Sequence, residues 1–381
     1  MTTVDDGVRA GRRRGRGRGH GAPSMADVAR MAGVSPQTVS RVANNRTNVD
    51  GTTRERVLDA MRALGYQPNI AARALATGRF GTIGVISFTV SNHGNARTLD
   101  GIADAAREAG FSINLVGITT PTRQAVRKAF GHLSTQAVDG IAIIEAEVLD
   151  TPSLLLPRGV PVVVADGHGS QEHPVIDSDQ AAGARLATEH LLDLGHSTVW
   201  HVAGPPDSNS ARHRHASWRR TLERAGRQVP QVLFGDWSAE SGHRLGAYLA
   251  GRPDVTAIFA ANDQMALGVL RALHEAGRAI PDEVSVVGFD DMPESAYFWP
   301  GLTSVRQDFA QVGRLCVQTL LAQIHVGAQE AGAAGDGTAM SAGVSAVAGL
   351  TAGMVHTVPV ELKVRGSSGA PRSGRLRLTD V

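Results

Sequence analysis

Apolar and polar residues follow two different periods along the chain, and the change of period separates two regions. Between Ser24 and Gly65, apolar residues recur at helical spacing in three short segments that are joined by tight turns. From Gly81 onward, apolar runs of strand length alternate with helical segments. The first pattern predicts a small helical bundle, and the second predicts parallel sheets that are covered by helices on both faces.

Eight apolar runs in the second region are predicted to be strands, which is too many for one compact sheet. They are 82–88, 112–118, 140–146, 161–166, 198–204, 231–237, 257–263 and 284–291. Helical segments between them, such as 95–110 and 179–195, end at a glycine suited to a helix C-terminus. The sequence therefore predicts an α/β body of two Rossmann-type subdomains, with a cleft at the carboxyl ends of their strands.

Composition places the chain among globular proteins of a reducing compartment. Its single cysteine, Cys316, excludes an internal disulfide. No apolar run reaches the 18 residues of a membrane span, and the arginine-rich N-terminus lacks the apolar core of a secretory signal. Residues 1–80 hold 14 Arg and 6 acidic residues, whereas the remainder is net acidic, although the whole chain carries only +2. A basic head on an acidic body indicates that the head meets a polyanion.

The second of the three short helices has the polar face expected of a DNA-reading helix. Ser24 with Asp27 and Thr52 with Glu55 are predicted to cap the first and third helices. Ser35 is predicted to cap the second, with Pro36 at its first position. Since two valines point inward, the outward side chains are Gln37, Thr38, Ser40, Arg41 and Asn44. Gln pairs with adenine and Arg with guanine, while Ser, Thr and Asn mostly contact the backbone. A bundle with a merely solvated polar face is the alternative.

The run from DVARMAGVSPQTVSRVANN to ALGYQPNIAARALATGR resembles the N-terminal signature of the lactose-repressor family of bacterial transcription regulators. The body stretches GDWSAESG, AANDQMALG, SVVGFDDMPES and LTSVRQDF are similar to stretches of the same family. The resemblance implies a helix-turn-helix DNA-binding head and a body like that of periplasmic sugar-binding proteins. It covers nearly the whole chain except the N-terminal tail and residues 327–355.

Further DNA-binding residues follow from this resemblance alone. Pro36, Gln37 and Arg41 match the base-reading positions, although Pro36 departs from the aromatic residue of the family's namesake and implies a different operator. Asn48 matches a position near the phosphate backbone. The segment that begins at Asn69 matches a hinge helix, in which Leu75 would be wedged into the minor groove. Without the resemblance, this segment would be an ordinary interdomain linker.

The organisation that follows has seven parts. They are a disordered basic tail (1–23), the helix-turn-helix head (24–68), a hinge helix and linker (69–80), an N-terminal effector subdomain (81–177 with 308–327), a C-terminal effector subdomain (178–307 with 356–366), a flexible insertion (328–355) and a flexible tail (367–381).

Candidate ligands for a small carbohydrate lie at predicted strand ends, and all but Asn92 and His93, whose stretch departs from the family's namesake, match family positions that line an effector pocket. They are Asn92, His93, Arg214, Trp237, Asn262, Asp290, Gln307 and Phe309. A guanidinium and carboxylates suit paired hydroxyls, and an indole suits the face of a sugar ring. Each also has a structural alternative: Asn262 could cap a helix, Asp290 could cap a turn, and Trp237 could be core.

The function expected is that of a homodimeric repressor. It would bind a pseudo-palindromic double-stranded operator and be released by a small sugar, with a galactoside as the first candidate. The alternative is a regulator of the same fold that responds to a purine or another corepressor. No nucleophile elbow or phosphate loop is present, so no enzymatic activity is expected. No cofactor, metal or membrane partner is expected either, and the location expected is the bacterial cytoplasm, at the nucleoid.

Overall fold

The structure is a computed structural model, and it consists of two compact units, residues 1–79 and 80–381. Each unit is described by itself. The residues whose structure is described are 23–43, 46, 48–67, 79–90, 92–118, 122–144, 160–167, 173–330 and 353–371. Three predicted segments lie wholly or largely outside these residues: the disordered tail (1–23), the hinge helix (69–76) and the flexible insertion (328–355). The predicted bounds of the insertion are wrong at both ends, because residues 328–330 belong to the helix Phe309–Glu330 and Val355 begins the strand Val355–Val358.

The described part of the first unit contains three helices, α1 (Met25–Ala32), α2 (Pro36–Ala43) and α3 (Gly51–Leu64). One fully buried valine from each helix, Val28, Val39 and Val57, forms the centre of its core. Ser24 and Asp27 form the predicted capping box of α1. The predicted cap of α3 at Thr52 is wrong, because the helix begins two residues earlier than predicted and the Asp50 carboxylate accepts the Thr53 N–H at 3.1 Å.

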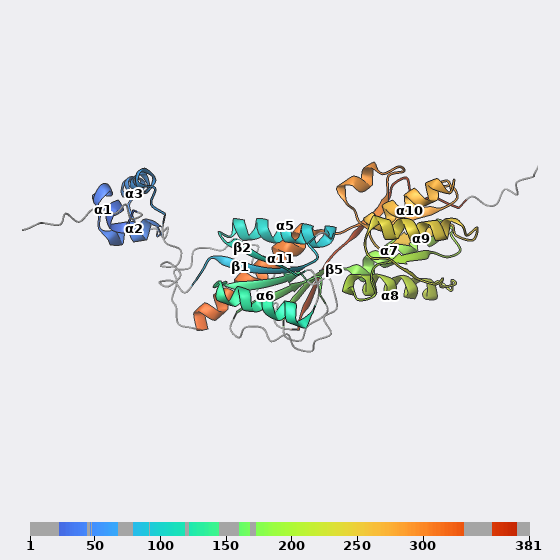
Figure 1. Cartoon of the computed structure of the whole chain (residues 1–381), viewed down its shortest axis with the longest axis horizontal. Helices are drawn as coiled ribbons and strands as arrows, with labels where there is room; N and C mark the ends of the chain where they lie inside the picture. Colours follow the sequence, from blue (N-terminus) through green and yellow to red (C-terminus); the bar gives the residue numbers. More distant parts are fainter. Residues whose placement is uncertain are drawn as a thin grey trace, which may run out of the picture. The chain divides into compact units, whose positions relative to one another are not determined.

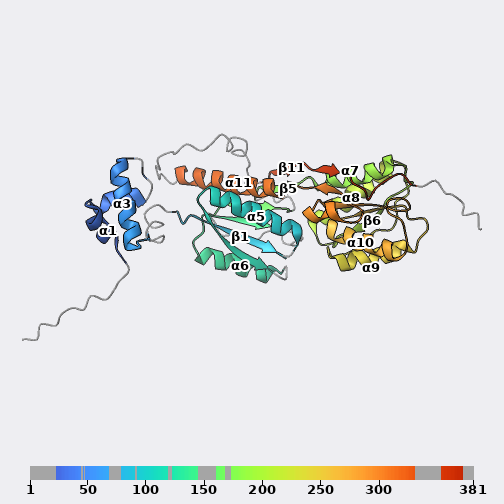
Figure 2. The same cartoon turned by 90° about the horizontal axis from the view of Figure 1, so that it is seen from above.

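The second unit contains two six-stranded sheets (Figures 1 and 2). The first has the order β11-β5-β4-β3-β1-β2, and its strand pairs are parallel. Its strands are β1 (Thr82–Phe88), β2 (Ser112–Ile118), β3 (Gly140–Ile144), β4 (Val162–Ala165), β5 (Val175–Ser178) and β11 (Val355–Val358). Helices α5 (His93–Glu108) and α11 (Phe309–Glu330) cover one face, and α6 (Arg123–Thr135) covers the other.

The second sheet has the order β12-β10-β9-β8-β6-β7, in which only the pairing of β12 with β10 is antiparallel among the described strands. Its strands are β6 (Trp200–Ala203), β7 (Leu233–Phe234), β8 (Ala257–Ala260), β9 (Ser285–Asp290), β10 (Thr303–Arg306) and β12 (Glu361–Lys363). Helices α7 (Gln180–Asp193) and α8 (Asn209–Arg224) cover one face, and α9 (Ala239–Ala250) and α10 (Asp263–Glu275) cover the other. The predicted pair of α/β subdomains is confirmed.

The chain passes between the sheets at three described places, and the last one corrects the predicted boundaries. The first two crossovers lie between β5 and α7 and between β10 and α11, close to the predicted residues 178 and 308. The prediction that 356–366 belongs to the second sheet is wrong for its first residues, because Val355–Val358 pair with β5 of the first sheet. Pro359, which has no N–H to donate, follows that strand, and the chain then enters β12.

The residues after β12 also differ from the predicted flexible tail. Ser367 is fully buried, and it exchanges hydrogen bonds with the backbone of Val286. The Gly369 N–H donates to Ser285 at 3.0 Å. The segment up to residue 371 is therefore part of the second subdomain, because Ser367 and Gly369 are hydrogen-bonded to the start of β9. Among the described helices, none combines the length and apolar character that a membrane crossing requires.

Candidate functional site

The exposed face of α2 carries the side chains predicted to read DNA. Val39 and Val42 are buried, so the helix turns its other positions outward. Ser35, Pro36, Gln37 and Arg41 are exposed, whereas Thr38 and Ser40 are half-buried. The Ser35 hydroxyl accepts the Thr38 N–H at 3.1 Å, as a helix cap does. The predicted orientation is confirmed, and contact with bases stays a prediction.

The remaining DNA-binding candidates are only partly covered by the described residues. Asn48 is exposed in the segment before α3. Asn44, Asn69 and Leu75 lie outside the described residues.

The eight predicted effector residues line one cavity in the second unit. They come from distant parts of the sequence and from both subdomains, including the loop after β1, helix α8, the loops after β7 and β8, the end of β9 and the crossover after β10. Parallel strands bring their carboxyl ends to one edge, which explains why side chains far apart in sequence meet there.

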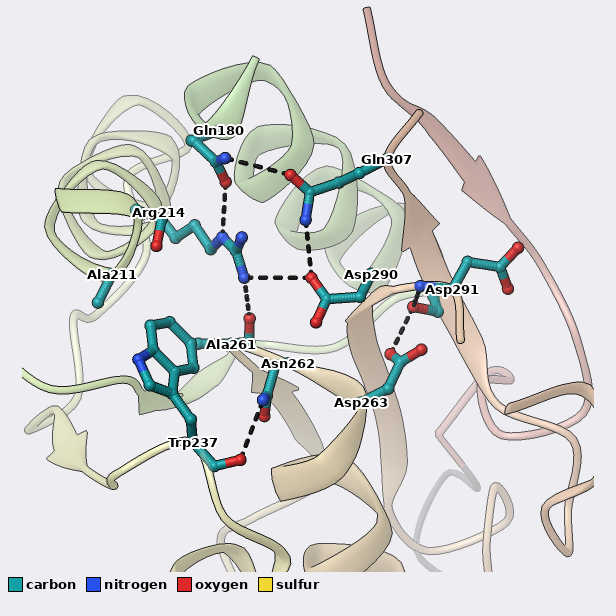
Figure 3. A network of polar contacts seen from close by, with 12 residues as sticks. Gln180, Ala211, Arg214, Trp237, Ala261, Asn262, Asp263, Asp290, Asp291 and Gln307 are labelled. Carbon is teal, nitrogen blue, oxygen red and sulfur yellow. Dashed lines mark hydrogen bonds and ion pairs between the residues drawn. The ribbon is translucent and has the colours of Figure 1, made fainter. Parts of the chain in front are cut away.

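Arg214 lies at the centre of the polar wall of this cavity (Figure 3). Arg214 is 4% exposed, and its guanidinium carbon lies 3.7 Å from the centre of the Phe289 ring. Its Nε donates to Gln180 Oε1 at 2.8 Å, and its Nη1 donates to the carbonyl of Ala261. The same Nη1 lies 3.7 Å from Asp290 Oδ1. These bonds fix the plane of the guanidinium fork, which is the geometry needed to hold two neighbouring oxygens.

Asp290 is the acidic partner in this wall. Burial raises the pKa of its carboxyl, and the Arg214 charge opposes that rise. Gln307 Nε2 donates to Asp290 Oδ1 at 2.7 Å, so the carboxylate has one oriented neutral donor and one nearby cation. Asp290 has a φ of 109°, a conformation that L residues rarely adopt and that tends to occur at functional sites.

Trp237 supplies the flat apolar surface of the cavity, and Asn262 positions it. Asn262 Nδ2 donates to the Trp237 carbonyl at 3.0 Å, while its Oδ1 accepts the Met265 N–H and caps α10. The structural alternative for Asn262 is thus confirmed together with its place in the cavity. Gly204, just after β6, allows the indole to approach, because a Cβ there would lie 2.3 Å from the ring.

We expect Gly204→Ala to displace the Trp237 ring from the cavity wall. The ring atoms would have to move, and forced overpacking of this kind costs about 1–3 kcal/mol. Near-ultraviolet circular dichroism and thermal unfolding would measure the two effects. Gly131→Ala in α6 is the matched control, because a Cβ there meets nothing within 4 Å. Unchanged aromatic signals in Gly204→Ala would contradict the expectation.

The residues of the first subdomain close the cavity from the other side. The rings of His93 and Phe309 meet edge to face, with centroids 5.9 Å apart. His93 also lies close enough to Asp290 for its charge to lower the pKa of that carboxyl. Asn92 directly precedes α5 and, although it has the position of a cap, makes no side-chain capping bond.

Asp166 was not predicted, although it follows the same strand-end rule as Asp290. It comes directly after β4 and lines the cavity. Its Oδ1 is shielded from solvent and has no hydrogen-bond partner among the described residues. Burial and the neighbouring Asp177 carboxylate raise the pKa of Asp166 well above its usual range, and burial raises the pKa of Asp177 to about 6. Both shifts have the same cause, because burial and a second nearby carboxylate disfavour the charged form of an acid.

Other polar residues of the cavity escaped the sequence analysis for want of a long-range signal. They are Asn95, Ser208, Ser210 and Gln264. Ser210 could have been found, because it precedes Arg214 by one helical turn and so shares its face of α8. Among the described residues, no group of His, Cys, Asp or Glu side chains has the arrangement of a metal site.

Asp263 is a buried carboxylate beside the cavity with a structural task. It accepts the Met292 N–H at 2.8 Å and the hydroxyls of Ser295 and Ser304 at 2.6 Å each. Burial raises the pKa of Asp263 to about 7. Gly288 leaves the space for it, since a Cβ there would lie 2.3 Å from the carboxylate. This cluster holds the loop after β9, and hence the backbone of Asp290, in place.

Both units are similar to known protein families. The family described as "Bacterial regulatory proteins, lacI family" matches residues 24–69, and the family described as "Periplasmic binding protein-like domain" matches residues 188–343. The chain is 36% identical over 312 residues to the Lactose operon repressor of Escherichia coli (strain K12), covering 78% of this chain and 84% of that protein.

Solved structures give the same result. The lac repressor dimer bound to operator and the anti-inducer ONPF is similar with a TM-score of 0.76 at 31% identity, over 92% of this chain and all of that chain. The complex of the transcriptional regulator CelR with cellobiose has a TM-score of 0.64 at 30% identity, over 91% of this chain and all of that chain. The chain therefore belongs to the lacI family of bacterial regulatory proteins and is a DNA-binding transcriptional regulator.

Proposed function

We propose that the chain is a homodimeric repressor of carbohydrate-utilisation genes. Two heads bind a pseudo-palindromic operator, and a small neutral sugar in the cavity releases them. The observation that carries this proposal is the buried Arg214, held in plane beside Asp290 and close to the Trp237 ring. A galactoside is the first candidate for the sugar, and the protein catalyses no reaction on it. DNA as the partner implies a location at the nucleoid.

The charges of the cavity favour a neutral ligand over an anionic one. Among the described residues of the wall, Arg214 is the one arginine or lysine, and Asp290 already lies 3.7 Å from it. The Asp166 and Asp177 carboxyls also lie close enough to Arg214 for its charge to lower their pKa values. A phosphate or carboxylate ligand would meet this excess of acids, whereas sugar hydroxyls can both donate to Asp290 and accept from Arg214. The relatives named for lactose and complexed with cellobiose are consistent with a neutral saccharide.

Exposed aromatic side chains near the end of the second sheet support a dimer. Tyr297 ends the short 3-10 helix η1 (Pro293–Tyr297) and is 88% exposed, and Trp299 is 97% exposed. Leu267 on α10 is also exposed, at 42%. Large exposed aromatics are uncommon on a monomer and are enriched in interfaces between proteins. A two-fold dimer would cover them and would match the symmetry of a pseudo-palindromic operator.

The proposal is tested by titrating the complex of the purified protein with its own upstream DNA at fixed salt. Fluorescence anisotropy of labelled DNA should fall as lactose is added, with cellobiose and glucose as comparisons and glucose 6-phosphate as the anionic control. Release by a neutral saccharide but not by the phosphate is the expected result. If no saccharide releases the DNA, the inducer hypothesis is wrong. A ligand that is required for DNA binding would instead indicate a corepressor.

A further inference from the structure

Gln180 occupies the first crossover between the subdomains and is bonded on three sides. It is the first residue of α7, two residues after the end of β5, and is 3% exposed. Its Oε1 accepts Arg214 Nε at 2.8 Å, and its Nε2 donates to Asp177 Oδ1 and to Gln307 Oε1, each at 3.1 Å. An amide nitrogen has two N–H groups, and both are used here. The orientation of the Gln180 amide is therefore fixed, with its oxygen toward Arg214.

The bond to Gln307 joins two crossovers that are 127 residues apart in the sequence. Gln307 lies in the second crossover, between β10 and α11, and is 7% exposed. Its own Nε2 donates to Asp290 Oδ1 at 2.7 Å. A continuous chain of hydrogen bonds thus runs from Arg214 through Gln180 and Gln307 to Asp290, as Figure 3 shows.

This chain ends at both charged groups of the cavity and passes through the segments where the subdomains hinge. A change in the angle between two domains is absorbed by a few residues in their connections. Breaking the Gln180–Gln307 bond in a buried place would leave polar groups without partners, which is costly. We infer that Gln180 is a positioning residue, which sets the plane of the Arg214 guanidinium and holds the two crossovers together. Through this connection, a ligand bound in the cavity changes the angle between the two subdomains.

Only the measurement of ligand affinity rests on the proposed function. Hydrogen exchange is therefore measured as well, because it needs no ligand. Amide hydrogen exchange of the full-length protein reports the crossovers directly. In Gln180→Met, which keeps the side-chain length and removes all three bonds, we expect amides at 178–180 and 306–308 to exchange about five- to tenfold faster. Thr188→Val is the matched control, because it removes a buried hydrogen bond to Ala184 from the same helix without touching this network.

A double-mutant cycle separates a tie between the crossovers from general destabilisation. Gln307→Met breaks the same bond from the other side and serves alone if Gln180→Met does not fold. If the amide–amide bond is the tie, the double variant should exchange no faster at 178–180 and 306–308 than the faster single variant. Additive effects in the cycle, or exchange in Gln180→Met equal to that of the native protein, would overturn the inference.

The ligand measurement uses lactose and cellobiose with the native protein and Gln180→Met. We expect about tenfold weaker affinity in the variant, since Arg214 loses an aligned charged hydrogen bond, and a smaller ligand-induced change in DNA affinity. Affinity and DNA response equal to those of the native protein would overturn the role at Arg214. If the native protein binds neither sugar, the proposed function loses its support, while the exchange measurements still decide whether Gln180 ties the crossovers.

Discussion

Arg214→Met should abolish the response to the effector and lower the free energy of unfolding of the second unit by about 3–5 kcal/mol. Methionine fills much of the space of the arginine stem but leaves the Asp290 carboxylate, 8% exposed, without its cation. It also leaves Gln180 Oε1 and the Ala261 carbonyl without donors. DNA binding should persist, because the first unit has a core of its own. Urea unfolding and DNA titration with and without sugar measure these effects.

The pH dependence of this loss has a definite sign. In the native protein, burial already raises the pKa of Asp290 and brings that of Asp177 to about 6. Without the guanidinium charge both pKa values rise further. A raised folded-state pKa means that stability is present at low pH and is lost as pH rises through that pKa. The deficit of Arg214→Met should therefore be largest above pH 7 and shrink below pH 6.

Arg219→Met is the matched control on the same helix. Arg219 forms an exposed ion pair with Glu223, with 59% of its side chain accessible, and such pairs contribute about 0–1 kcal/mol. Both arginines lie on α8, but only Arg214 is buried. A comparable loss of unfolding free energy in the two variants would therefore contradict the role assigned to Arg214. A deficit that grows as pH falls would contradict the account of the carboxyl groups.

The sequence predicted the cavity better than it predicted the crossovers, and the reason is physical. Asp290 ends a fully buried apolar strand, so periodicity puts it at one edge of a sheet, whereas Trp237 follows a strand of only two residues and was placed there with the help of the family resemblance. β5 has only four residues and includes Asp177, so no apolar run predicted it, and the role of Gln180, two residues after the strand, was not predicted. Asp166 follows β4 in the same way that Asp290 follows β9, and a consistent use of the strand-end rule would have found it.

The hydrophobic pattern of a segment could not predict which distant strand the segment pairs with. The run that contains β11 and β12 is nearly continuous in sequence, yet its first half pairs with β5 and its second half with β10. Nothing in the hydrophobic pattern says which sheet an edge strand joins, because that depends on the partner and not on the strand. The same holds for Ser367, whose polarity suggested an exposed tail but whose hydroxyl replaces a strand bond at Val286 and Thr303.

In the helix-turn-helix head, Arg41→Ala should weaken operator binding by about 30-fold to 10⁴-fold. One bidentate contact between Arg and guanine is worth about 1–3 kcal/mol, and a symmetric dimer loses it in both half-sites. The fold of the head should survive, because Arg41 is exposed while Val39 and Val42 of the same helix fill the core. Anisotropy titrations with the operator and with a shuffled duplex, at one salt concentration, measure the change.

Arg30→Ala separates base reading from simple loss of charge. Arg30 lies at the end of α1, with 76% of its side chain accessible, and pairs with Asp27 at 2.9 Å. Both substitutions remove one positive charge from the same small unit, so both reduce the general attraction to phosphates. Only Arg41→Ala should reduce the ratio of operator affinity to shuffled-duplex affinity, because only a base contact depends on sequence. Equal loss on the two duplexes in Arg41→Ala would mean that α2 does not read guanine through this residue, and Gln37 would then have to carry the discrimination.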